Sequence, residues 1–217
     1  MIETLDNGIQ LAVTGVCSGI ALYNAVMSRK KIWAMFAIFF SGFFMGNLYW
    51  QLFLQFYGDS PPEFYVADLS WYVSYFFLFL ILKTISAGTG HNVSPGEKPA
   101  KSIRVIEWII ILFSAGMCIY YMQWGDIISD IISALLMALI AIEAVKGLYL
   151  PKGERSGLYL LSLIFVIVEY GIWTASCFWL GDTLLNPYFW FDTGLSIILL
   201  LLLITTLKEF GGGSKTE

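Results

Sequence analysis

Seven apolar stretches, each long enough to cross a lipid bilayer, constrain the fold of this chain more than any other feature. About 20 helical residues span the roughly 30 Å hydrocarbon core of a bilayer. The chain is 58% hydrophobic and only 13% charged, and its connections are short. We therefore predict an all-α integral membrane protein that is one domain over residues 1–217. The approximate stretches are 8–27, 32–56, 64–86, 103–122, 127–146, 157–180 and 184–207.

The charged residues predict how the helices are oriented. If the N-terminus is outside, all 12 Lys and Arg residues fall at inner helix ends and inner loops. Basic residues near helix ends favour the cytoplasmic side. The sequence thus predicts a multi-pass protein of the cell membrane with its N-terminus outside and its C-terminus cytoplasmic. The outer side carries the acids Glu3, Asp6, Asp59, Glu63, Asp126 and Asp182.

Two stretches align without gaps and indicate an internal repeat. WQLFLQFYGDS begins at Trp50 and WTASCFWLGDT at Trp173, and each precedes a proline and then a helix with an early acid, Asp68 or Asp192. Both copies begin outside, so we predict two parallel three-helix units: repeat A over 1–86, a linker helix over 103–122 and repeat B over 124–210. Chance similarity is the alternative, because Gly-Asp-Ser is common in turns.

The layout of seven helices with an outer N-terminus and a three-plus-one-plus-three arrangement resembles the SWEET and PQ-loop transporters, and seven-helix receptors and microbial rhodopsins share the topology. The resemblance covers the whole chain. It implies small-solute transport or ligand sensing. The chain departs from these families because it has no Pro-Gln pair, and its last stretch has no mid-span Lys that could hold retinal. The segment DLSWYVSYFFLFL from Asp68 is also similar to membrane sensor regions that precede bacterial kinase or cyclase domains.

Polar residues at helical spacing predict which face of each stretch lies inside the bundle. In the first stretch they form the series Gln10, Thr14, Cys17, Ala21 and Asn24. Similar series in the other stretches lead to nine candidate ligand- or ion-binding residues. These are Asn47, Gln51, Asp68, Trp71, Tyr75, Asp130, Glu169, Trp173 and Asp192.

The acids among the candidates differ in what they predict. Glu169 and Asp192 lie deep in their stretches with no basic residue at their depth, so they must pair, line water or stay protonated. That setting suits a proton or cation site, and a purely structural role is the alternative. We expect Asp126 to be a helix N-cap, whereas Asp68 is either a cap or a cavity residue. The outer tryptophans form an interfacial belt or an aromatic cage.

Other motifs predict packing rather than chemistry. GVCSG from Gly15 and GFFMG from Gly42 are pairs of small residues that let helices approach closely. We expect Glu107 and Glu143 to pair with nearby basic residues, and the three cysteines to be packed thiols. The one histidine, His91, is in a predicted loop, so we expect no metal site and no catalytic dyad.

The sequence favours a small-solute transporter or facilitator with a central acidic and aromatic site. The alternative is a receptor-like sensor that binds a small ligand from outside and signals to a separate partner, and a scaffold in a larger complex is a third candidate. We expect no enzyme activity and no cofactor. The lipid bilayer is the expected partner, and no nucleic acid is expected. A small-molecule or cationic ligand fits the polar interior. The chain could also form a homo-oligomer.

Overall fold

The computed structural model describes residues 2–58, 65–88, 101–149, 156–179 and 181–211. These residues form seven long helices, each apolar enough to cross a membrane, which confirms the predicted helical membrane bundle. Asp59 and Glu63, which we expected on the outer side, the proline of the first repeat (Pro62) and the loop residue His91 lie outside the described residues. The helices are α1 (Ile2–Ser28), α2 (Lys31–Tyr57), α3 (Val66–Gly88), α4 (Lys101–Tyr121), α5 (Ile127–Leu148), α6 (Ser156–Phe178) and α7 (Pro187–Phe210).

Several helix ends have clear chemical causes. Asp126 precedes α5 and its carboxylate accepts hydrogen bonds from the backbone N–H groups of Ile128 and Ser129, so the predicted N-cap is confirmed. Asn186 caps α7 in the same way, and Pro187 occupies the first position of that helix. α2 ends at Tyr57 and is followed by the cap residue Gly58, whose positive φ of 72° is a backbone conformation that glycine adopts without strain.

The start of α1 differs from the prediction. The apolar stretch begins at Gly8, but the helix begins at Ile2. Hydropathy marks only the lipid-compatible part of a helix, and the additional turn is polar. Its consequence is that Asp6, which we expected on the outer rim, is 8% exposed and lies on the buried face of α1.

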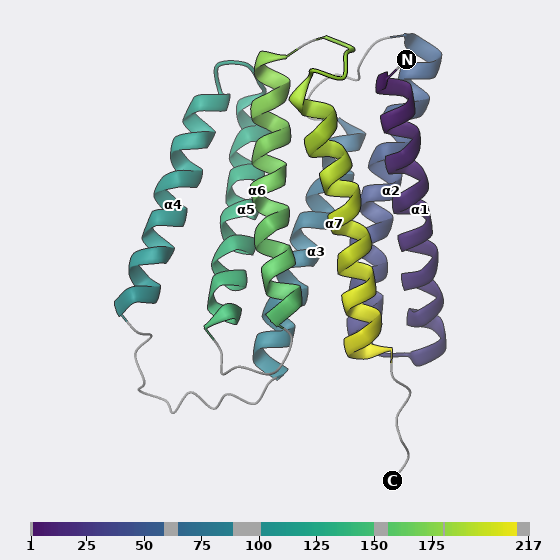
Figure 1. Ribbon diagram of the computed structural model, residues 1–217. Coiled ribbons are helices and arrows are strands. Elements are labelled where there is room, and N and C mark those ends of the chain that lie inside the picture. The colour runs from purple at the N-terminus through teal and green to yellow at the C-terminus, as the bar shows by residue number, and fades with distance from the viewer. Residues whose placement is uncertain (1, 59–64, 89–100, 150–155, 180, 212–217) are drawn as a thin grey trace.

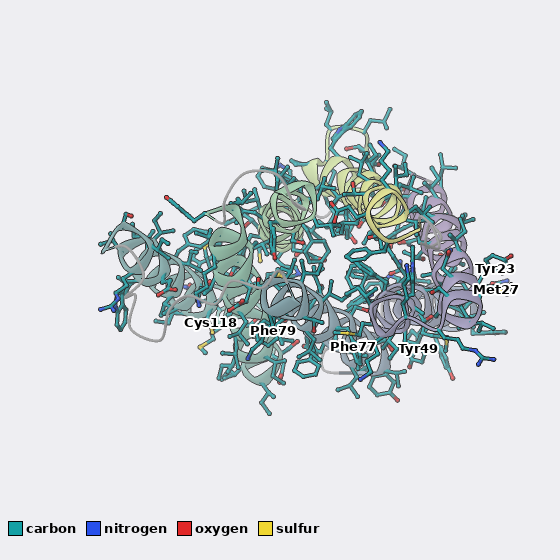
Figure 2. The ribbon with its side chains drawn as sticks, turned by 90° about the horizontal axis from the view of Figure 1, so that it is seen from below. Tyr23, Met27, Tyr49, Phe77, Phe79 and Cys118 are labelled. Carbon is teal, nitrogen blue, oxygen red and sulfur yellow. The ribbon has the colours of Figure 1, made fainter. Side chains whose placement is uncertain are left out.

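Six of the helices surround a common centre. The neighbouring pairs are α1 with α2, α2 with α3, α3 with α5, α5 with α6, α6 with α7, and α7 with α1. α4 lies outside this ring and packs against α5, at the left of Figure 1. The end-on view in Figure 2 shows side chains that point into the ring and others, such as Tyr23 and Met27 of α1, that point outward.

The outer surface of the bundle is apolar, as a lipid-facing surface must be. α4 is the extreme case, because most of its faces are uncovered: Trp108 is 63% exposed and Leu112 68% exposed. The basic residues of the described helices all lie at one end of the bundle, the lower end in Figure 1. With the two residues between α1 and α2 included, they are Arg29, Lys30, Lys31, Lys83, Lys101, Arg104, Lys146 and Lys208.

The half of the bundle toward this basic end is densely packed. Phe36, Phe39 and Phe40 of α2 are fully buried and pack against one another, at ring-centroid distances from 4.8 to 6.5 Å. At its edge, Lys146 forms ion pairs with Glu107 at 3.3 Å and with Glu143 at 3.4 Å, which confirms the predicted pairing of these two acids. The polar interior is therefore concentrated in the opposite half.

Candidate functional site

A cavity of about 670 Å³ lies within the ring, in the half opposite the basic end. All seven helices contribute to its lining. Its deepest lining residues include Phe43 on α2, Tyr75 on α3, Glu169 on α6 and Leu195 on α7. Glu169 lies nine positions before the end of α6 at Phe178, or about 14 Å along the helix axis at 1.5 Å per residue. The cavity therefore reaches about half-way through the bundle.

The structure places eight of the nine candidate residues around this one cavity. They are Asn47, Asp68, Trp71, Tyr75, Asp130, Glu169, Trp173 and Asp192. Gln51 instead lines a second, neighbouring pocket of about 520 Å³, together with Glu3 and Gln55. Asn7 lines both pockets, so Gln51 is close to the main cavity without facing it.

Asp68 has both of the roles that we considered for it. It lies in the first turn of α3, and its carboxylate accepts a hydrogen bond of 2.9 Å from the backbone N–H of Tyr65, the residue before the helix. Such a bond satisfies one of the donors near a helix start. Asp68 also lines the cavity. A cap at the cavity rim therefore brings negative charge to the site.

Asp192 lies at the contact between α7 and α1. Gln10 of α1 donates a hydrogen bond of 2.5 Å to Asp192 Oδ1. The Asp6 side chain lies against that of Asp192, close enough for a hydrogen bond between the two carboxyl groups. Two ionised carboxylates repel each other at such a distance, so this pair needs a proton or a cation. The Oδ2 atoms of both residues are buried without a hydrogen-bond partner among the described residues.

Glu169 is the most deeply placed acid of the cavity. It is 3% exposed, its carboxyl group faces the hydroxyl group of Tyr75, and Oε1 has no hydrogen-bond partner within the described chain. Asn47 presents a second unused group. Its side-chain oxygen accepts a 3.2 Å hydrogen bond from the Trp71 indole N–H, but Nδ2 is buried and donates to no described residue.

Aromatic residues form much of the cavity wall. Trp173 packs edge-on against Tyr170 and Tyr121, with ring centroids 5.3 and 6.1 Å away. The Tyr121 hydroxyl group donates to the Tyr170 carbonyl oxygen at 3.1 Å, which joins α4 to α6. On the other side of the cavity, the ring centroids of Trp50 and Trp71 lie 5.8 Å apart. The tryptophans that line the cavity therefore do more than form an interfacial belt.

An aromatic layer closes the cavity toward the basic end. Phe165 of α6 lies 5.8 Å from Phe43, 6.4 Å from Phe39 and 5.9 Å from Tyr75, measured between ring centroids. All four side chains are at most 4% exposed. The layer joins α2 and α3 to α6 directly beneath the cavity. Nearer the basic end, the hydroxyl groups of Ser86 on α3 and Tyr159 on α6 form a 3.0 Å hydrogen bond.

Among the residues that sequence reasoning missed are Tyr170, which lines the cavity, and Asp6, which lies against the lining residue Asp192. Asp6 was missed because the polar first turn of α1 was not recognised as helical, although Asp6 continues the predicted series through Gln10 and Thr14 at a spacing of four. Tyr170 follows Glu169 directly in the chain, and it was not singled out from the sequence. The helical spacing in α1 was the available signal for Asp6.

The charge of the lining is of one sign. Its carboxyl groups belong to Asp68, Asp126, Asp130, Glu169 and Asp192, and no Lys, Arg or His is among the described lining residues. Within the described ranges, no group of three or more His, Cys, Asp or Glu side chains is arranged to hold a metal ion.

The chain matches no family model, no curated protein and no solved structure. The arrangement of the site is therefore the basis for assigning a function.

Proposed function

We propose that this chain is a small-solute transporter or facilitator of the cell membrane. The observation that carries the proposal is a polar cavity that extends half-way through a membrane bundle and ends on a packed aromatic layer. A transporter that alternates between two open states has such a cavity on one side at a time. In this proposal the N-terminus is outside and the C-terminus cytoplasmic, because the described basic residues gather at the end away from the cavity.

The ring order supports a transporter made of two three-helix units. The proposed units are α1–α3 and α5–α7, with α4 as the linker. Within each unit, the first helix packs on the second and the second on the third, and the third helix of each unit packs on the first helix of the other. A two-fold rotation about an axis along the membrane normal would produce this order, in line with the proposed parallel repeat.

Hydrogen bonds at the two contacts between the units also support this proposal. Gln10 of α1 bonds to Asp192 of α7, and Ser129 of α5 bonds to Tyr72 of α3. The stretch NAV from Asn24 and the stretch EAV from Glu143 lie near corresponding ends of α1 and α5. If these two stretches correspond in the proposed repeat, then Gln10 corresponds to Ser129. Both contacts lie in the half of the bundle that holds the cavity. The units would move relative to each other at these two contacts.

Movement of the two units relative to each other would open the cavity toward the basic end of the bundle. The contacts that close the basic end run between the units: Phe165 belongs to one unit and Phe39, Phe43 and Tyr75 to the other. The Ser86–Tyr159 hydrogen bond also joins the two units. Rocking about the cavity would separate these groups and give its contents access to the cytoplasmic side. The proposed role is binding and passage, without catalysis or a cofactor.

Uptake into proteoliposomes tests the proposal. The native protein, Glu169→Gln and Asp192→Asn would be compared across a panel of sugars, amines and amino acids, with proton movement recorded at several pH values. Glu107→Gln is the matched control, because Glu107 lies outside the cavity at the ion pair with Lys146. We expect uptake of at least one solute, unchanged in the control and reduced at least tenfold in one of the two cavity variants.

The sensor alternative makes a different prediction in the same experiment. The cavity would suit a ligand that enters from outside and shifts the bundle for a separate cytoplasmic partner. A solute that binds the native protein but never crosses the membrane would favour the sensor and contradict the transporter. A scaffold role would be indicated if the panel shows neither binding nor flux.

A further inference from the structure

The cavity carries an electrostatic signature that indicates what it can bind. Five carboxyl groups line it, and no basic side chain of the described lining balances them. Charge interactions are much stronger in a water-poor interior than in water. An anion would therefore be repelled by the acidic lining, whereas a cation would be drawn in from the acidic end.

Two polar groups in the cavity lining need a partner that the described chain does not supply. Glu169 is 3% exposed and Asn47 is 6% exposed, so both are more than nine-tenths buried. Glu169 Oε1 is an unused acceptor and Asn47 Nδ2 an unused donor. Buried polar groups without partners are rare because each costs about 1–3 kcal/mol. A ligand that donates to Glu169 and accepts from Asn47 would remove both costs.

The aromatic wall adds a third requirement. Tyr75 faces Glu169, and Trp173 packs against Tyr170, which follows Glu169 in α6. Aromatic faces attract cations, and the attraction strengthens where water is excluded. A carboxyl group that shares a cavity with aromatic rings suits an organic ammonium group better than a small metal ion, which needs several oxygen ligands.

We infer that the cavity binds a small organic cation: an ammonium group at Glu169 between the rings of Tyr75, Tyr170 and Trp173, with a neutral hydrogen-bond acceptor toward Asn47. The inference rests on the proposed function and names its substrate class. The acceptor is a hydroxyl, ether or carbonyl group rather than a carboxylate, because the lining has no base to neutralise one. A volume of about 670 Å³ is within the usual range of small-molecule sites, roughly 300–1,000 Å³.

Calorimetric binding to the purified full chain in detergent tests the inference with matched probes. Ethanolamine carries an ammonium group that can donate to Glu169 and a hydroxyl group that can accept from Asn47. Choline keeps the positive charge and the hydroxyl group but has no N–H donor, so it tests the attraction of the charge to the carboxyl groups and aromatic rings. The neutral alcohol 3,3-dimethylbutan-1-ol has the shape of choline without its charge, and glycine betaine adds a carboxylate. We expect one of the two cations to bind at least tenfold more tightly than the neutral alcohol and the betaine. The inference is overturned if neither cation binds, or if the neutral alcohol binds equally well.

Variants then locate the binding site. We expect Glu169→Gln to weaken binding of the preferred cation at least tenfold, and Glu107→Gln to leave it unchanged. Trp173→Leu should weaken binding, and Trp173→Phe should restore part of it because a ring face returns. The tryptophan pair decides the question if Glu169→Gln does not fold. Unchanged affinity in folded Glu169→Gln, or equal affinities of the Leu and Phe variants, would overturn the placement.

Binding and flux can fail separately. Cation binding in detergent without flux in liposomes would contradict the transporter and leave the cation site intact. Flux of a neutral solute without cation binding would contradict this inference and leave the transporter intact.

Discussion

The side-chain amide of Gln10 donates a hydrogen bond to the carboxyl group of Asp192, 182 positions later in the chain. The bond joins α1 to α7 and closes the ring of helices around the cavity. Asp6 lies against the same carboxyl group, so both partners of Asp192 come from one face of the first helix. The first and last helices thereby meet at a buried polar contact.

Replacing Gln10 with Ala should destabilise the bundle through this contact. Asp192 Oδ1 would lose its donor while it remained buried, at a cost of about 1–3 kcal/mol. Thermal unfolding in detergent measures the change. Gln55→Ala is the matched control, because Gln55 is exposed near the C-terminal end of α2. Equal melting temperatures for the two variants would contradict a stabilising role for the Gln10–Asp192 bond.

Replacing Phe165 with Ala should make the membrane leaky. Phe165 contacts aromatic side chains of both α2 and α3, and its loss would open the layer beneath the cavity. We expect faster passive efflux of small solutes from liposomes, together with a loss of stability of about 3–5 kcal/mol. Phe76→Ala should leave efflux unchanged, because Phe76 is 44% exposed on the outer surface of α3. If liposomes with the Phe165→Ala and Phe76→Ala variants show the same rate of efflux, the aromatic layer is not a barrier.

Replacing Gly42 with Ala should disrupt the contact between α2 and α3. A methyl group at this position would lie 2.8 Å from the Ser70 carbonyl oxygen, and backbone cannot move aside as a flexible side chain can. We expect a lower melting temperature, with a cost of about 1–3 kcal/mol for overpacking. Gly19→Ala on α1 provides the contrast, because nothing lies within 4 Å of the added atom. If Gly42→Ala melts no lower than Gly19→Ala, the close approach of the helices is not needed.

Replacing Asp126 with Ala should weaken the start of α5 by about 0.5–2 kcal/mol, the usual cost of a lost N-cap. Asp126→Asn should retain most of the stability, because an amide oxygen can still accept from the N–H groups of Ile128 and Ser129. Chemical unfolding in detergent compares the two. Asn and Ala variants of equal stability would contradict the capping role. Since Asp126 also lines the cavity, ligand binding should be measured in both variants.

Much of the fold followed from local properties of the chain. The seven spans were predictable because a bilayer requires long apolar runs, and the Asp126 cap because it precedes such a run. The series on α1 that helical spacing predicted is confirmed at Gln10, Thr14, Cys17 and Ala21, which are buried, whereas its last member, Asn24, is only partly buried. The proposed repeat rests on sequence similarity and on the ring order, and it stays a prediction.

Other features depend on contacts between distant segments. The position of α4 outside the ring could not be predicted from its apolar sequence. A helix that is apolar on most faces suits either the centre of a bundle or its lipid-facing edge. Gln51 shares a helix with Asn47 at a spacing of four, yet the two line different pockets. Asp68 both accepts a hydrogen bond at the start of α3 and lines the cavity, because the first turn of α3 borders the cavity.

The sequence by itself determined the membrane-spanning helices. The bilayer selects long runs of hydrophobic residues, and within each run a helix satisfies all of its backbone hydrogen bonds without help from other segments. Only the tertiary structure decided that Asp6, Gln10 and Asp192 meet, and that Glu169 and Asn47 line one cavity with unused polar atoms. These relationships arise from the packing of helices far apart in the chain. In a membrane that packing is set by side-chain shape and by the pairing of buried polar groups, which no single stretch of sequence contains.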